Sequence, residues 1–348
     1  MTARERIARE IEREGGWIPF ARYMQLALHE PGLGYYANGT RKFGPQGDFV
    51  TAPELGDLFG RTLARQLAEI PGGRILELGA GSGALAETLL KALDCEYFIL
   101  ETSAELRQRQ RERLPARVVF LDALPKAFEG AILANEVADA MPVHLVHWTE
   151  QAILERGVGA DLSWQDRPAS VNLLEEASKI EVPRPYFSEI NLLAKPWVRS
   201  LLDCLSRGVI FVIDYGFPHH EYYHPQRAAG TLMCHHRHRS HADPFARPGE
   251  EDITAHVDFS ALAAAAREAK AQVLGYATQA QFLVNSGITD VLGEANIENA
   301  LHYAPIAAQA QKLLSPAEMG ELFKVLAVGK GRQAPLLGFS RGDRAHTL

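Results

Sequence analysis

The segment Gly79-Ala80-Gly81-Ser82-Gly83 constrains the fold of this chain more than any other feature. It follows the short apolar stretch Arg74–Leu78, which predicts a strand, and it precedes a helix with Leu85, Leu89 and Leu93 on one face. Closely spaced glycines let the backbone turn sharply and let a ligand approach, and the first N–H groups of the helix point at that ligand. The order strand, glycine loop, helix therefore predicts a cofactor site in an α/β protein.

Further strands and helices alternate after this loop. The alternation predicts a parallel sheet with helices on both faces. We therefore expect the fold class α/β, a Rossmann-like doubly wound sheet with an N-terminal helical section and inserted elements. The predicted strands are 74–78, 97–100, 118–121, 131–134, 209–213, 272–277 and 322–328, and the predicted helices include 3–14, 18–29, 103–113, 188–206 and 258–270.

The 348 residues exceed one minimal domain, so we expect a core with additions. Polar and histidine-rich stretches interrupt the strand–helix alternation, and a long loop of this kind is typical of a lid. The expected organisation is an N-terminal helical section with a cofactor-covering loop (1–72), a core (73–330), inserted short strands at about 143–187, a His-rich lid at about 217–255, a helical section at about 278–320 and a C-terminal tail (331–348).

Composition excludes several kinds of partner. The formal net charge is −7, and an acidic chain is a poor binder of nucleic acid, whose phosphates require clustered Lys and Arg. No apolar run reaches the roughly 18 residues of a membrane span, so we expect no membrane insertion. Cys95, Cys204 and Cys234 are odd in number and far apart, which argues against a disulfide framework and favours a reducing, cytoplasmic location.

The glycine loop alone allows two cofactor classes. Gly79, Gly81 and Ala84 also fit the dinucleotide pattern G-x-G-x-x-G/A, so NAD is the alternative ligand. Glu77 favours S-adenosylmethionine, because a carboxylate inside the strand can face its cationic methionine end, where a dehydrogenase strand is apolar. Glu101 ends the second strand, where it can accept hydrogen bonds from ribose hydroxyls in either class. An adenine-contacting group would lie at Asp122, after the third strand.

Seven stretches, in order along nearly the whole chain, resemble the MidA-like methyltransferases, a family that includes the mitochondrial arginine methyltransferase of complex I assembly. The chain departs from the family pattern at Val137-Ala138, where aromatic residues are expected. The resembling stretches are Gly47–Glu54, Glu77–Gly83, Asn135–Val143, Ile213–Gly216, Gly230–Leu232, Ala255–Phe259 and Met319–Leu326.

The resemblance implies S-adenosylmethionine as cofactor and assigns residues to its site. It places the loop of Asp48 and Thr51 over the cofactor cleft, although the acids there, Glu54 included, could equally cap a helix. The expected cofactor-binding residues are Asp48, Thr51, Glu77, Gly79, Gly81, Gly83, Glu101, Asp122 and Asn135.

The resemblance further implies methylation of an arginine in a protein, with a core subunit of respiratory complex I as one candidate. A guanidinium stays protonated in water, so carboxylates must orient it and localise its charge. Glu136 and Asp139 are three residues apart, which in a helical turn puts both on one side. The expected catalytic residues are Glu136, Asp139 and Asp214; the alternative is that Asp139 caps a turn and Glu136 orients backbone near the cofactor.

A histidine-rich tract lies between residues 219 and 241. It has no standard zinc-ligand spacing, so we expect a solvated lid and no metal site. A non-catalytic alternative for the whole chain is an assembly factor that keeps the methyltransferase fold to bind a partner. The tract contains His219, His220, His224, His235, His236, His238 and His241, with Cys234 among them.

Overall fold

The computed structural model describes residues 1–39, 51–296, 299–331 and 335–348. The chain divides into two compact units. Unit 1 comprises residues 1–49, 139–196 and 217–258, and unit 2 comprises residues 50–138, 197–216 and 259–348. The chain therefore passes between the units several times, and each unit is described separately.

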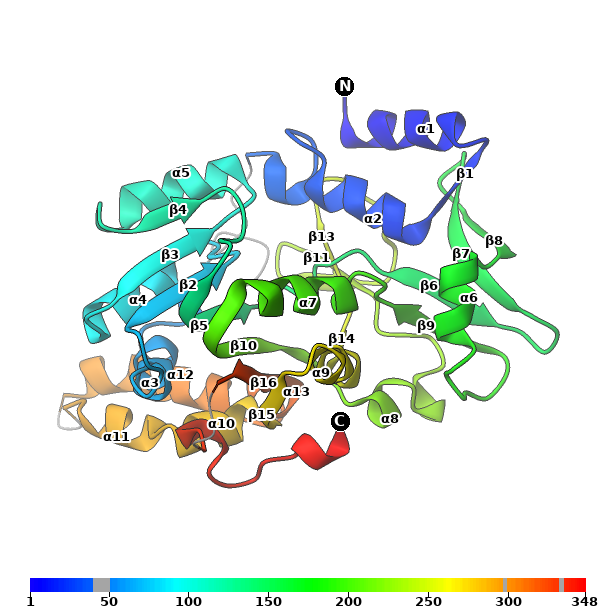
Figure 1. Ribbon diagram of the computed structural model, residues 1–348. Helices are drawn as coiled ribbons and strands as arrows, with labels where there is room; N and C mark the ends of the chain where they lie inside the picture. The colour runs from blue at the N-terminus through cyan, green and yellow to red at the C-terminus, as the bar shows by residue number, and fades with distance from the viewer. Residues whose placement is uncertain (40–50, 297–298, 332–334) are drawn as a thin grey trace. The chain divides into compact units, whose positions relative to one another are not determined.

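The sheet of unit 2 has the order β15-β16-β10-β5-β2-β3-β4 (Figure 1). The strands from β4 to β10 pair in parallel, and β16 is antiparallel to both of its neighbours. The order confirms the predicted α/β class. The strands are β2 (Arg74–Leu78), β3 (Glu96–Leu100), β4 (Val119–Leu121), β5 (Phe128–Asn135), β10 (Leu205–Phe217, whose last residue belongs to unit 1), β15 (Gln272–Thr278) and β16 (Phe323–Lys330).

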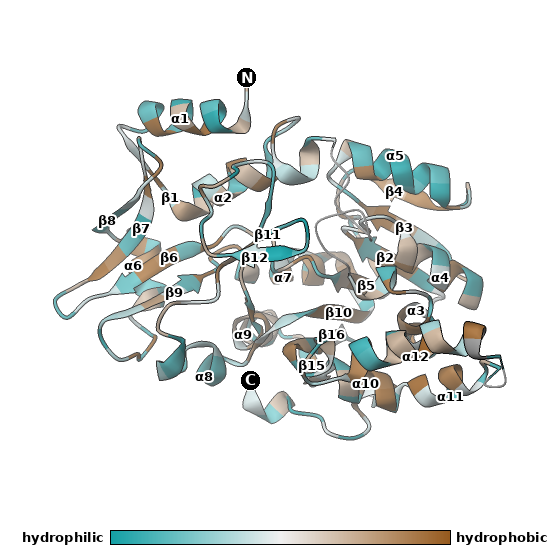
Figure 2. Ribbon diagram, turned by 180° about the vertical axis from the view of Figure 1, so that it is seen from behind, coloured by the Kyte–Doolittle hydropathy of each residue, from teal (hydrophilic) through white to brown (hydrophobic). Residues whose placement is uncertain are grey.

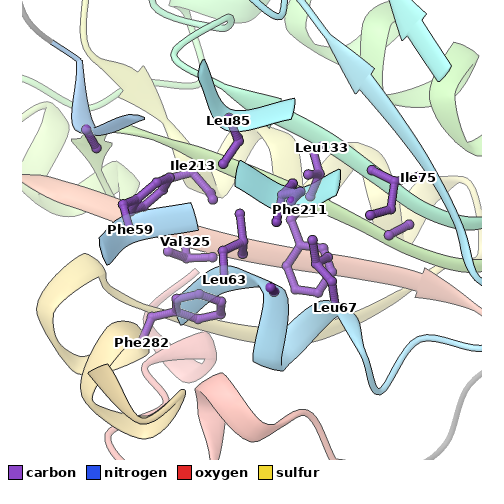
Figure 3. Close-up of a cluster of buried hydrophobic side chains, with 14 of the residues drawn as sticks. Phe59, Leu63, Leu67, Ile75, Leu85, Leu133, Phe211, Ile213, Phe282 and Val325 are labelled. Atoms are coloured by element: carbon purple, nitrogen blue, oxygen red, sulfur yellow. The ribbon is translucent and has the colours of Figure 1, made fainter. Parts of the chain in front are cut away.

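Helices of unit 2 cover this sheet and form its main core. In α3, Phe59, Leu63 and Leu67 follow one another at four-residue steps, which places them on the face that packs against Phe211 and other sheet residues (Figure 3). The helices are α3 (Leu58–Leu67), α4 (Ala84–Ala92), α5 (Ala104–Arg113), α7 (Ala194–Cys204, which begins in unit 1), α9 (Phe259–Glu268), α10 (Gln279–Asn285), α11 (Ile288–Gly293), α12 (Ala300–Leu314) and α13 (Met319–Leu322).

The strand order reverses at β2. The next strand in sequence, β3, lies on one side of β2, and β5 lies on the other. At such a switch point the connecting helices leave in opposite directions, and a crevice opens beyond the carboxyl ends of the strands. The residues that follow β2, β3 and β5 therefore surround the place where a ligand binds in folds of this class.

Unit 1 contains two smaller sheets. One has the order β1-β7-β6-β9 with β8 paired to β7, and the other has the order β12-β11-β13. The elements are α1 (Ala3–Arg13), β1 (Trp17–Pro19), α2 (Phe20–His29), β6 (His144–Trp148), β7 (Ile153–Gly159), β8 (Trp164–Pro168), α6 (Val171–Ala177), β9 (Tyr186–Ile190), α8 (His219–Tyr222), β11 (Met233–His236), β12 (Arg239–His241), β13 (Asp252–Thr254) and β14 (Val257–Asp258).

Two sequence predictions in unit 1 are wrong in detail. The helix expected over 188–206 begins only at Ala194, because Tyr186–Ile190 forms β9, paired antiparallel to β6. Trp17–Pro19 forms a short strand on β7, where the helix was expected to begin at residue 18. Both strands are specified by a distant partner, so local periodicity did not reveal them.

No helix in the described part of the chain is long and apolar enough to cross a membrane. Figure 2 shows α5 coloured mainly hydrophilic, in agreement with its many charged residues. Its buried positions are Leu106 and Gln110, four residues apart.

Candidate cofactor and active site

The glycine loop has the backbone conformation that glycine alone adopts easily. The φ angles are +59° at Gly79, +55° at Gly81 and +80° at Gly83, all left-handed. A Cβ atom on Gly79 would also lie 3.1 Å from the Val137 side chain. The Gly79 N–H donates to the carbonyl of Leu100 at 3.0 Å, which fixes the loop to the end of β3. Any side chain at these positions would therefore strain the loop.

The chain before α3 reaches the glycine loop. Residues Ala52–Glu54 form a short 3-10 helix that begins after the buried Thr51, and the Ser82 hydroxyl donates to the Glu54 carboxylate. Thr51 lies three residues before Glu54, and its contact with the cofactor remains a prediction. Asp48, the other residue predicted in this segment, lies outside the described residues.

Glu101 lies at the carboxyl end of β3 and is held by Gln110 of α5. The Gln110 side-chain NH2 donates to the Gly81 carbonyl at 2.9 Å and to the Glu101 carboxylate at 3.1 Å, and the Ser103 N–H donates to Glu101 at 2.9 Å. Burial raises the pKa of Glu101, while these hydrogen bonds oppose the rise. One buried amide thus joins the glycine loop to the carboxylate predicted to bind ribose.

Glu77 is buried inside β2, in contact with Tyr97. The Tyr97 hydroxyl donates to the Glu77 carboxylate at 2.8 Å. Burial raises the pKa of Glu77 to about 7, the Tyr97 hydrogen bond lowers it, and the charge of Glu101 raises it further. The carboxylate lies in the strand as expected, and its contact with the methionine end of the cofactor remains a prediction.

Asp122 lies just beyond β4 on the surface. Its side chain is 89% exposed and forms an ion pair with Arg107 at 2.5 Å. An adenine contact, which remains a prediction for this residue, would compete with that ion pair. A surface pair of this kind stabilises by about 0–1 kcal/mol, so the competition is weak.

The chain turns sharply after β5. Glu136 has a left-handed φ of +53°, and its N–H donates to the Ile213 carbonyl at 2.9 Å. The Asn135 side-chain NH2 donates to the Glu136 carboxylate at 3.2 Å. Among the described residues, the buried Oδ1 atom of Asn135 has no hydrogen-bond partner. A buried acceptor without a donor is unfavourable, so a ligand donor at this point would be stabilising.

Asp214 fixes this turn from the neighbouring strand. It is fully buried in β10, and its carboxylate accepts from the N–H groups of Ala138 at 3.0 Å and Tyr215 at 2.9 Å. Residues 136–139 are not helical. The prediction that a helical turn puts Glu136 and Asp139 on one side is therefore wrong, because Asp214 holds the turn in another conformation. The catalytic roles themselves remain predictions.

Asp139 belongs to unit 1. It is 6% exposed, and its carbonyl accepts from the Ala255 N–H at 3.0 Å. His29 lies close by in the chain's fold, with Nε2 at 3.3 Å from the carbonyl of Ala140, and burial lowers the pKa of His29. These contacts connect the start of the predicted acceptor segment to α2 and to the stretch before β14.

Gln110 was not predicted as a site residue from the sequence, although a signal was present. Leu106 and Gln110 are the buried positions of an otherwise charged helix. A polar residue at a position where the helix period requires an apolar one indicates a buried hydrogen-bonding role. Tyr97 was missed for a different reason, because a tyrosine in a core strand gives no sign of which group its hydroxyl contacts.

The residues present fit S-adenosylmethionine. Three left-handed glycines open the backbone at the start of α4, where N–H groups face a ligand. The Glu101 carboxylate lies at the end of β3 for the ribose hydroxyls, and Asn135 offers a buried acceptor at the end of β5. These groups lie at the ends of neighbouring parallel strands, on the edge of the sheet where ligands bind in folds of this class.

Comparison with known proteins identifies the class. Residues 58–277, more than half of the chain, match the family described as "Putative S-adenosyl-L-methionine-dependent methyltransferase". The chain belongs to this family of S-adenosylmethionine-dependent methyltransferases, and S-adenosylmethionine is its cofactor. The resemblance found in the sequence is confirmed.

Particular relatives extend along nearly the whole chain. A Burkholderia thailandensis protein, described as a "likely methyl transferase" and crystallised with S-adenosyl-homocysteine, is 48% identical with a TM-score of 0.95, covering 99% of this chain and 96% of that one. The mitochondrial protein arginine methyltransferase NDUFAF7 homolog of Drosophila melanogaster is 29% identical, covering 93% of this chain and 86% of the relative. The Homo sapiens NDUFAF7 protein is 26% identical, covering 90% and 80%.

Proposed function

We propose that this methyltransferase modifies arginine side chains of a protein. The supporting observation is the similarity, over 93% of the chain, to a relative named as a protein arginine methyltransferase. An alignment over 93% of the chain includes most of unit 1 as well as unit 2.

The chemistry sets what the acceptor site must do. S-adenosylmethionine, when bound, supplies an electrophilic methyl group on a sulfonium. The protein must align an acceptor nitrogen with that group and exclude water, and alignment supplies much of the rate enhancement. A guanidinium is a poor nucleophile because its charge is delocalised. Carboxylates that hold two of its nitrogens localise the charge and leave the third with more lone-pair character.

Glu136 and Asp139 are the proposed carboxylates. Glu136 directly follows the β5 end, where Asn135 and the Asp214-held turn fix its backbone. Asp139 begins the stretch of unit 1 that continues into β6. Each charge-assisted hydrogen bond to a guanidinium is worth about 1.5–3 kcal/mol. Losing one carboxylate should therefore lower turnover by about one to two orders of magnitude.

Purified protein tests these roles. Glu136→Gln and Asp139→Asn keep the side-chain shape and remove the charge. We expect both variants to bind S-adenosylhomocysteine nearly as the unchanged protein does, and to transfer methyl groups much more slowly. Unchanged turnover in both variants would remove the two residues from the mechanism without affecting the cofactor assignment.

The acceptor is identified by mass spectrometry of proteins from cells with and without this enzyme. We expect methyl-arginine to be lost from at least one protein in its absence, and the family resemblance makes a core subunit of respiratory complex I the first candidate. Methylation of a lysine, an RNA or a small molecule instead would refute the arginine proposal.

The free state of Cys95, Cys204 and Cys234 supports placing the reaction in a reducing, cytoplasmic compartment.

The second candidate is an assembly factor without activity. It predicts that S-adenosylhomocysteine binds but that no methylated product forms with any partner. A methylated product that requires the intact glycine loop excludes it.

A further inference from the structure

We propose that unit 1 contains a zinc-binding site formed by Cys234, His241 and Glu251. The sulfur, one imidazole nitrogen and one carboxylate oxygen of these residues all lie within 4.8 Å of one another. These residues belong to unit 1 and the glycine loop belongs to unit 2, and the proposal does not depend on the proposed arginine activity.

The strand register explains why these residues meet. Cys234 of β11 is directly opposite His241 of β12, and on its other side it is opposite Ile253 of β13 (Figure 2 labels β11 and β12). Directly opposite residues point to the same face of a sheet. Glu251 directly precedes β13, and its carboxylate lies beside the cysteine sulfur and the histidine nitrogen. The three residues have no standard zinc-ligand spacing in the sequence, but the strand pairing brings their side chains together.

The distances are close to those of a tetrahedral site. His241 Nε2 lies 3.0 Å from a carboxylate oxygen of Glu251. Zinc–ligand bonds of about 2.0–2.3 Å at tetrahedral angles separate neighbouring ligand atoms by roughly 3.3–3.7 Å. The nitrogen and oxygen already have nearly this separation, and the sulfur needs a shift of about 1 Å at most. Rotation of the side chains supplies shifts of that size.

Burial and charge favour a divalent cation here. Cys234 and Glu251 are 0% exposed, whereas the His241 side chain is 31% exposed and offers access from solvent. The two charges of a zinc ion would balance the Cys234 thiolate and the Glu251 carboxylate, so these three groups together would be neutral.

The ligand types select the metal. Sulfur and imidazole nitrogen are poor ligands for magnesium and calcium but suit zinc. Binding releases the thiol proton. His241 Nδ1 now accepts from the Asp243 N–H at 3.3 Å, so a ring that binds zinc through Nε2 moves its proton to Nδ1 and gives up this long hydrogen bond. Three protein ligands leave the fourth position to water.

Cobalt(II) is the spectroscopic probe. The full chain, freed of metal by a chelator and dialysed, is titrated with cobalt(II) and then with zinc. We expect one cobalt ion per chain, the absorption bands of a tetrahedral thiolate site, loss of those bands as zinc replaces cobalt, and no effect of magnesium. Elemental analysis should give one zinc per chain after dialysis.

Matched variants decide where the metal binds. Cys234→Ser and Glu251→Gln should raise the zinc dissociation constant more than 100-fold, since even indirect partners of metal ligands change affinity by about 10–100-fold. The controls are Cys204→Ser, a buried cysteine outside the cluster, and His238→Gln, an exposed histidine of the same tract; both should bind as the unchanged chain does.

Circular dichroism and thermal unfolding, measured in every variant, report whether the chain is folded. The absence of a stoichiometric tetrahedral cobalt spectrum in the unchanged, folded chain would overturn the proposal. Cobalt and zinc binding that survives in folded Cys234→Ser protein would overturn it equally, because the metal would then lie elsewhere.

Discussion

Replacing Gln110 by leucine tests how the cofactor site is built. The leucine fills a similar volume but removes the hydrogen bonds to the Gly81 carbonyl and to Glu101. A neutral hydrogen bond contributes about 0.5–1.5 kcal/mol and one to a charged group about 1.5–3 kcal/mol, so the substitution should remove about 2–4 kcal/mol of stabilisation. Most of this loss lowers the free energy of unfolding, because both bonds exist without ligand.

The affinity for cofactor should fall as well. Glu101 then keeps the Ser103 N–H but loses the Gln110 donor, and the glycine loop loses one of its hydrogen bonds to α5. If about 1.4 kcal/mol of the loss appears in binding, the dissociation constant of S-adenosylhomocysteine rises about tenfold. Isothermal titration calorimetry measures this directly, and thermal unfolding measures the change in stability.

Gln108→Leu is the matched control on the same helix. Gln108 is exposed and donates to Glu112, one turn away, an interaction worth about 0.2–0.5 kcal/mol. The Gln108→Leu substitution should leave the affinity for S-adenosylhomocysteine unchanged. The positioning role of Gln110 is refuted if folded Gln110→Leu protein binds S-adenosylhomocysteine as tightly as the Gln108→Leu control.

Three further substitutions have defined outcomes. Because the folded pKa of Glu77 is about 7 and its ordinary value is 4.5, the unchanged protein should lose about 3 kcal/mol of stability as pH rises from 4.5 to beyond 7. Urea unfolding at pH 5 and pH 8 should show a loss of stability that is smaller by about that amount in Glu77→Gln. Equal losses in the two proteins would contradict the raised pKa of Glu77. Asp214→Asn should lower the unfolding free energy by about 1–3 kcal/mol, since one backbone N–H loses its acceptor. An unchanged urea midpoint would show that the turn after β5 does not depend on the Asp214 carboxylate. Glu101→Gln should weaken S-adenosylhomocysteine about 10–100-fold in calorimetry, and unchanged binding would exclude a ribose contact.

The sequence predicted the parallel strands of unit 2 well. The expected strand at residues 74–78 coincides with β2, and the next two differ from β3 and β4 by one residue. Central parallel strands are buried on both faces and therefore read as short apolar runs, and glycines and charged helices separate them. The strands of unit 1 were harder, because β1 and β9 depend on pairing with distant partners.

The candidate site was predictable only where strand position determines it. Glu101 was predicted from its place after the second strand and Asn135 from the resembling stretch Asn135–Val143; their contacts with the cofactor remain predictions. The conformation of the turn at Glu136 was not predicted. It depends on a left-handed residue and on a hydrogen bond from the Ala138 N–H to Asp214, 76 positions away. Such long-range hydrogen bonds leave no periodic pattern in a sequence.

The central claim is that the loop Gly79–Gly83 binds S-adenosylmethionine. Calorimetry with S-adenosylhomocysteine and NAD, on the unchanged chain and on Gly81→Val, tests it most directly. The left-handed φ of +55° at Gly81 and the space a ligand needs there predict tight S-adenosylhomocysteine binding, much weaker NAD binding, and loss of S-adenosylhomocysteine binding in a folded Gly81→Val protein. Tighter binding of NAD, or unchanged S-adenosylhomocysteine affinity in folded Gly81→Val, would contradict the account.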